Sequence, residues 1–207
     1  MTRHFKPSDR CKPNGRKPNE ANRLRIIGGE WRSRVIEFPD TEGLRPTANR
    51  VRETLFNWLG QALHGKRCLD LFAGSGALGF EAASRGASEV VMVENNRLVL
   101  EALKTNQEKL IAPQCRLIPQ DATEFLARNQ ERFDIVFLDP PFGSGLMATF
   151  LDQLEPHLSA HGQVYVEWGE PIEAVISTIR KSDWQLAKQG KAGAVHFGLL
   201  SIGKGAT

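Results

Sequence analysis

Four consecutive residues, Asp139-Pro140-Pro141-Phe142, combine groups that could hold a planar amine. The Asp139 carboxylate and the Pro140 carbonyl can accept the two hydrogens of such an amine, and Phe142 can stack on the ring that carries it. The two prolines stiffen the loop and add no backbone N–H that would compete for the acceptors. The alternative interpretation is that Pro-Pro ends a strand and that Phe142 belongs to the core.

A glycine-rich segment, Asp70-Leu-Phe72-Ala-Gly74-Ser-Gly76-Ala-Leu-Gly79, could hold a nucleoside cofactor. It contains GxGxxG where a predicted strand meets a predicted helix, whose N-terminus offers free N–H groups. This pattern fits a dinucleotide as well as S-adenosylmethionine. Asp70 favours S-adenosylmethionine, because a carboxylate beside the turn would repel a pyrophosphate and attract a sulfonium and an ammonium group.

Two further acids follow the next predicted strands. Glu94, with Asn95 beside it, can accept hydrogen bonds from the ribose hydroxyls of either cofactor. Asp121 could accept from an adenine amino group while the Ala122 N–H donates to a ring nitrogen. Asp121 could equally cap the next helix, and Glu94 could be a solvated strand end. Three acids at the ends of three successive strands favour a cofactor site.

An amine held opposite this cofactor could be methylated. The lone pair of an exocyclic amine is delocalised into its ring, so the amine is a poor nucleophile. Two acceptors would pull the nitrogen toward tetrahedral geometry and stabilise the positive charge that develops on it. The sequence therefore predicts an N-methyltransferase site built from the tetrad and the glycine loop.

The elements that must position these residues alternate along the chain. Predicted strands cover residues 67–72, 89–93, 115–118, 133–138, 163–168, 184–188 and 195–202, and predicted helices cover 77–84, 97–110, 122–128, 146–158 and 172–180. This order predicts a doubly wound, Rossmann-like α/β fold with a mostly parallel seven-stranded sheet and an antiparallel edge. The first and fourth of these strands should be neighbours, so that the tetrad faces the glycine loop.

Three segments precede this core of residues 66–207. Residues 1–22 read as a basic, disordered arm, since they contain almost nothing that could be buried. Residues 23–43 predict a β-hairpin turning at Gly28 and Gly29, and residues 44–65 a leading helix with Thr47 as its N-cap. We expect residues 23–207 to form a single methyltransferase domain.

Composition excludes several classes of protein. The 207 residues, 41% apolar and 25% charged, contain no apolar run near the ~20 residues that span a membrane. The start lacks the apolar core of a secretory signal, so we expect a cytoplasmic protein. Three cysteines without CxxC spacing and five histidines without ligand spacing predict no metal site.

The net charge of +3 conceals an uneven distribution along the chain. Residues 1–34 carry ten Lys/Arg and three Asp/Glu, a net charge of +7, whereas residues 35–207 carry a net charge of −4. A basic arm on a mildly acidic body predicts a nucleic-acid partner. The alternative interpretation is a solubilising tail.

Two segments near the start indicate which family of methyltransferases the chain resembles. They are Arg25-Ile-Ile-Gly-Gly-Glu-Trp-Arg-Ser-Arg34 and Leu44-Arg-Pro-Thr-Ala-Asn-Arg50-Val-Arg-Glu-Thr-Leu-Phe-Asn-Trp-Leu59. With the glycine loop and the tetrad, they resemble the RsmD family of bacterial 16S rRNA guanine-N2-methyltransferases, a class I S-adenosylmethionine-dependent family. The resemblance covers about residues 23–201. Small departures are Ser33, where glycine is common, and Asn49 and Asn95.

The resemblance implies roles for individual residues. Asp139, Pro140, Pro141 and Phe142 would clasp the guanine amine. A second group would contact S-adenosylmethionine: Asp70, Phe72, Gly74, Gly76, Gly79, Glu94, Asn95, Asp121 and Ala122. The Arg-Pro-Thr segment would close over the methionine end of the cofactor, with Thr47 and Arg50 nearby.

The implied substrate is a loop guanine of 16S rRNA within an assembling 30S particle, and we expect a monomeric enzyme. Five arginines could hold the surrounding phosphates, or could instead form surface ion pairs: Arg25, Arg32, Arg34, Arg45 and Arg52. The tetrad would also suit the N6 amine of adenine in DNA or RNA. A further alternative, a non-catalytic RNA-binding assembly factor, is disfavoured because the glycine loop and the tetrad are both intact.

Overall fold

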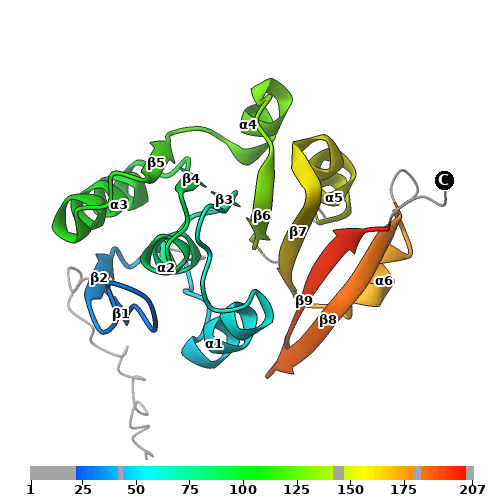
Figure 1. Ribbon diagram of the computed structural model, residues 1–207, viewed down its shortest axis with the longest axis horizontal. Coiled ribbons are helices and arrows are strands. Elements are labelled where there is room, and N and C mark those ends of the chain that lie inside the picture. The colour runs from blue at the N-terminus through cyan, green and yellow to red at the C-terminus, as the bar shows by residue number, and fades with distance from the viewer. Residues whose placement is uncertain (1–21, 42–43, 142–146, 180–182, 204–207) are drawn as a thin grey trace, which may run out of the picture.

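The computed structural model of the protein describes residues 22–41, 44–141, 147–179 and 183–203. Its centre is a twisted sheet with helices on both faces (Figure 1). Most of the predicted arm, residues 1–21, lies outside the described residues, as does Phe142. No helix in the described part of the chain is long and apolar enough to span a membrane.

The sheet has seven strands in the order β5-β4-β3-β6-β7-β9-β8. Their bounds are β3 (Arg67–Asp70), β4 (Glu89–Val93), β5 (Cys115–Ile118), β6 (Phe133–Leu138), β7 (Leu158–Trp168), β8 (Trp184–Ala192) and β9 (Val195–Ile202). The strands from β5 to β7 pair in parallel, and β9 pairs antiparallel with both β7 and β8. The predicted fold is confirmed, including the pairing of the first and fourth core strands, β3 and β6.

Side chains of the buried strands alternate between two hydrophobic layers, because successive residues of a strand point to opposite faces. One layer contains Cys68, Phe137 and Tyr165, and it is covered by helices α1 (Asn49–Trp58), α2 (Ala77–Ser84) and α3 (Arg97–Leu110). The other layer is covered by α4 (Ala122–Arg128), α5 (Met147–Leu154) and α6 (Ile172–Ile176). Figure 1 shows these two groups of helices on opposite sides of the sheet.

A two-stranded hairpin, β1 (Asn22–Arg25) and β2 (Val35–Phe38), packs on the first layer. Its connection spans residues 26–34, which is longer than the predicted turn at Gly28 and Gly29. Ser33 adopts a φ of 70° within this connection, a left-handed conformation that favours glycine. Ser33 therefore carries a backbone strain that glycine at this position would avoid.

Several other boundaries differ from the prediction: β3 ends at Asp70 rather than at residue 72, β8 extends to Ala192 rather than to residue 188, and α6 ends at Ile176 rather than at residue 180. Helix α1 has Ala48, not Thr47, as its N-cap, and no side chain caps it. The predicted helix 146–158 stops at Leu154 and continues as a short 3-10 turn, η1 (Glu155–His157), because Pro156 cannot donate the next helical hydrogen bond. Strand β7 consequently begins at Leu158 rather than at residue 163.

Candidate active site

Four acids lie along the carboxyl edge of the sheet. Asp70 ends β3, Glu94 and Asp139 directly follow β4 and β6, and Asp121 follows β5. Because β5, β4, β3 and β6 are consecutive neighbours, these positions line one continuous edge. The helices change face between β3 and β6, and ligands of doubly wound folds bind at such a point.

Asp70 is 2% exposed, and its Oδ2 accepts the Gly79 N–H at 2.9 Å. Gly79 lies in the first turn of α2, whose N-cap Gly76 has no side chain to satisfy that turn. Asp70 therefore caps the helix from the neighbouring strand, a role that the sequence did not reveal. Burial raises the pKa of Asp70 to about 7, the negative charge of Glu94 adds to this rise, and the Gly79 hydrogen bond opposes it.

The glycine loop needs its glycines for two reasons. Gly74 and Gly76 have φ values of 48° and 79°, in the left-handed region. A Cβ at Gly76 would also lie 2.6 Å from the Phe80 ring, and one at Gly74 would lie 2.9 Å from Leu44 Cδ1. The second contact shows that Leu44, which directly precedes the Arg-Pro-Thr segment, lies against the glycine loop.

Glu94 binds this loop from the next strand. Its Oε2 accepts the Gly74 N–H at 3.0 Å, and its Oε1 accepts the Asn96 N–H at 2.7 Å. Asp121 accepts the Thr123 N–H at 2.8 Å and is the N-cap of α4, as the alternative interpretation of this residue predicted. A carboxylate has about four lone-pair sites, so both acids keep acceptor capacity for a ligand.

Three other residues expected at the cofactor occupy different surroundings. The Phe72 ring packs edge-on against Phe150 of α5, with ring centroids 5.1 Å apart. Ala122 is buried at the start of α4, and Asn95 is exposed. The structure therefore brings Asp70, the glycines and Glu94 together, while Phe72 leans toward the opposite layer.

Asp139 follows β6, next to the glycine loop. Burial raises the pKa of its carboxyl well above the ordinary value, and the charges of Glu167 and Asp70 raise it further. Pro140 is buried and Pro141 is exposed. A carboxyl in this environment is well placed to accept a proton.

Glu167 and Tyr165 complete the edge, and neither was predicted. Glu167 lies near the end of β7, is 8% exposed, and accepts the Tyr165 hydroxyl at 2.9 Å. Thr47 also hydrogen-bonds to Glu167. Glu167 follows the buried run Val-Tyr-Val, the same signal of an acid at the end of an apolar strand that identified Glu94.

These acids share an electrostatic property. Within the described part of the chain, no Lys, Arg or His forms an ion pair with Asp70, Glu94, Asp139 or Glu167. The described residues also contain no cluster of His, Cys, Asp and Glu that could hold a metal ion. The edge therefore suits an organic cation, which would supply the missing positive charge.

Comparison with known proteins decides the family. Residues 24–201 match the family model described as "Conserved hypothetical protein 95". Ribosomal RNA small subunit methyltransferase D of Escherichia coli K12 is 42% identical over 188 residues, which cover 89% of this chain and 93% of that protein. The chain belongs to the RsmD family.

A further relative and a solved structure agree with this assignment. Ribosomal RNA small subunit methyltransferase D of Haemophilus influenzae is also 42% identical, over 88% of this chain and 95% of its own length. The solved structure of yhhF from Escherichia coli superimposes with a TM-score of 0.76 at 39% identity, covering 86% of this chain and 97% of that one. The methyltransferase fold predicted from the sequence is thus shared across almost the whole length of these relatives.

One of the five arginines expected to contact RNA in this RsmD protein does not reach the surface. Arg52 is 0% exposed, pairs with Glu81 Oε2 at 3.3 Å, and donates to the Arg25 carbonyl at 2.9 Å. Its prediction as a phosphate contact is wrong. Leu55 and Phe56 follow Arg52 by three and four residues, so all three side chains lie on the same face of α1. Because Leu55 and Phe56 are fully buried, Arg52 is buried with them.

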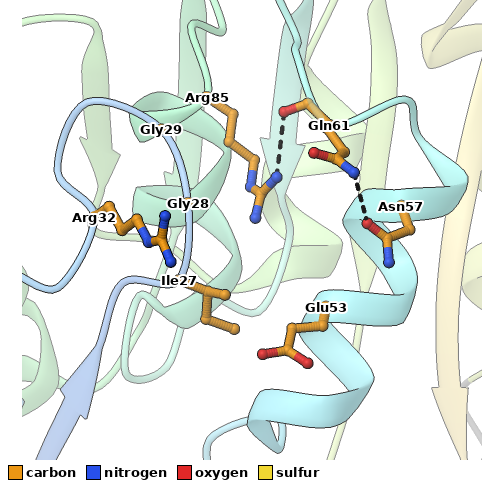
Figure 2. Close-up of a pocket in the computed structure, with 8 residues that line it drawn as sticks. All are labelled: Ile27, Gly28, Gly29, Arg32, Glu53, Asn57, Gln61 and Arg85. Atoms are coloured by element: carbon orange, nitrogen blue, oxygen red, sulfur yellow. Dashed lines mark hydrogen bonds between the residues drawn. The ribbon is translucent and has the colours of Figure 1, made fainter.

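The other four arginines are exposed. Arg25 donates to the Ser33 carbonyl at 3.2 Å, and Arg34 donates to the Lys109 carbonyl at 2.6 Å near the end of α3. Arg32 lines a hollow of about 550 Å³ between the hairpin connection and α1, and Figure 2 shows its guanidinium beside Gly28. Arg85, at the C-terminal end of α2, also lines this hollow. The glycine loop precedes the N-terminal end of α2, so the hollow and the glycine loop lie at opposite ends of this helix.

Proposed function

We propose that this protein transfers a methyl group from S-adenosylmethionine to the exocyclic N2 of a loop guanine in 16S rRNA. The observation that carries the proposal is the neighbouring position of Asp70 and Asp139 at the ends of β3 and β6, beside the glycine loop. The relatives named ribosomal RNA small subunit methyltransferase D support the class of substrate.

The residues at this edge fit S-adenosylmethionine. Asp70 is a buried carboxyl with a raised pKa and no basic partner among the described residues, so a cationic ligand would stabilise its ionised form. Gly74, Gly76, Glu94 and Asp121 would hold the ligand, and the segment with Thr47 and Arg50 would cover it. When bound, the cofactor supplies a methyl group activated by its sulfonium charge.

The chain's own contribution to transfer centres on Asp139. Its carboxylate would accept one N2–H of guanine and aim the nitrogen lone pair, while the Pro140 carbonyl accepts the other. The N2 nitrogen must lose a proton once it has gained a fourth bond. Asp139 can accept that proton, because its pKa is raised by burial and by its acidic neighbours.

The exposed arginines and the arm support an RNA substrate. Arg32 is exposed in the connection between β1 and β2, and Arg45 is exposed in the segment that precedes α1. The region before residue 35 carries a net charge of +7, which suits a polyanion. We place the guanine in an assembling 30S particle, with the protein acting as a monomer in the cytoplasm.

A labelling experiment tests this function. Immature 30S subunits are incubated with the protein and radiolabelled S-adenosylmethionine, and the RNA is digested to nucleosides. We expect N2-methylguanosine from the natural chain and from Asp183→Asn, an exposed acid, but none from Asp139→Asn, which should still bind the particle. Label in N6-methyladenosine would favour the adenine alternative, and unlabelled RNA would overturn the proposal.

A further inference from the structure

Glu167 stands beside Asp139 on the neighbouring strand. Strands β6 and β7 run parallel, with Phe137 opposite Tyr165 and Leu138 opposite Val166. Continuing this register by one residue places Asp139 next to Glu167, and parallel neighbours lie about 4.8 Å apart. Alternation along both strands puts the two acids on the face that carries Phe137 and Tyr165.

Two side chains fix the position of the Glu167 carboxyl by hydrogen bonds. The Tyr165 hydroxyl donates to its Oε2 at 2.9 Å, and Thr47, ahead of α1, hydrogen-bonds to the same carboxyl. The charge of Glu167 acts directly on Asp139, which shows that the two groups share one environment. A carboxyl fixed in this way retains acceptor capacity toward the edge where Asp139 lies.

We propose that Glu167 is a specificity-determining residue, whose carboxylate accepts the N1–H of the target guanine while Asp139 accepts an N2–H. This inference rests on the proposed function and names the group that selects the base. Guanine presents N1–H and N2–H side by side on one edge, which matches two adjacent acceptors. Adenine presents a lone pair at N1, which a carboxylate repels.

The test uses an analogue that keeps the amine and lacks the N1 hydrogen. Particles are assembled with either guanine or 2-aminopurine at the target nucleotide, and kcat/KM is measured for both with the natural chain and with Glu167→Gln. Glu173→Gln, an exposed acid on α6, is the matched control. Tyr165→Phe removes the tether but keeps the carboxylate, and binding of S-adenosylhomocysteine by calorimetry reports whether each variant retains its cofactor site.

We expect the natural chain and Glu173→Gln to prefer guanine over 2-aminopurine at least tenfold. The reason is that 2-aminopurine has no N1–H, so it would leave the buried Glu167 carboxylate without a hydrogen-bond donor. Glu167→Gln should lose most of this preference by slowing on guanine alone, and Tyr165→Phe should lose less. Equal slowing of Glu167→Gln on both substrates would overturn the inference and leave the proposed function intact. A natural chain that methylates neither particle would instead overturn the proposed function.

Discussion

The Arg52 guanidinium lies 3.3 Å from Glu81 Oε2, and neither side chain is exposed. Glu81 also accepts the N–H groups of Ile27 and Gly28, each at 2.8 Å, and pairs with Arg85 at 2.9 Å. One buried carboxylate thus joins α1, α2 and the hairpin connection. This ion cluster joins elements that cover the face of the sheet carrying Cys68, Phe137 and Tyr165.

Replacing Glu81 with Gln should therefore destabilise the protein strongly. The fully buried Arg52 and the partly buried Arg85 would lose their counter-charge, and breaking a buried pair costs about 3–5 kcal/mol. Urea denaturation would measure the loss. Glu101→Gln, which removes an exposed pair with Lys104, should change the free energy of unfolding by less than about 1 kcal/mol and serves as the control. Similar losses in both variants would contradict a structural role for the cluster.

Asp70→Asn should stabilise the ligand-free protein at alkaline pH. The folded pKa of Asp70, about 7, exceeds its ordinary value of 3.8, so the folded state binds more protons between these values and stability falls as pH rises through them. The side-chain amide of Asp70→Asn does not ionise, so the variant avoids this loss of stability, which amounts to up to about 4 kcal/mol. The amide oxygen can still accept the Gly79 N–H. Melting temperatures of both proteins should diverge from pH 4 to pH 8.

The same substitution should weaken cofactor binding, because it removes a negative charge beside the site for the sulfonium. Calorimetric titration with S-adenosylmethionine would measure this loss. Asp183→Asn, at an exposed position, should alter neither property. An Asp70→Asn protein that is destabilised at pH 8 would show that the helix cap requires the charge.

Gly76→Ala should be far more damaging than Gly60→Ala. Both glycines have left-handed φ values, 79° and 92°, so alanine pays a backbone penalty of roughly 1–2 kcal/mol at either. Only at Gly76 would the new methyl group meet Phe80 and Leu103, whereas the space around Gly60 is open. Chemical denaturation and cofactor titration of the two variants would separate strain from steric conflict. Equal losses would indicate that backbone strain alone decides the effect.

Arg32→Ala and Arg45→Ala should each weaken binding to the RNA substrate and reduce the slope of log K against log salt by about 1, since each should remove one phosphate contact. Arg128→Ala, an exposed arginine at the end of α4 on the opposite layer, is the control. Filter binding over a salt series would measure both quantities. An unchanged slope for all three variants would exclude Arg32 and Arg45 from the RNA interface.

The sequence predicted the features that depend on local pattern. Alternating strands and helices indicated the sheet order, and Asp70 and Asp139 were recognised because each ends an apolar run. Arg52 could not be recognised as buried, because its partner Glu81 is 29 residues away and meets it only in the folded chain. Thr47 looked like a helix cap for a similar reason, since its partner Glu167 lies far along the chain.

Main-chain N–H groups of the hairpin and its connection donate to side chains that come much later in the sequence. Ile27 and Gly28 bind Glu81, Trp31 binds Ser84, and Glu37 binds Asn106, at separations of 53 to 69 residues. A chain emerging from the ribosome therefore exposes the hairpin before its docking surface exists. The hairpin can therefore take its final position only after the segment that forms α2 and α3 has been translated and folded.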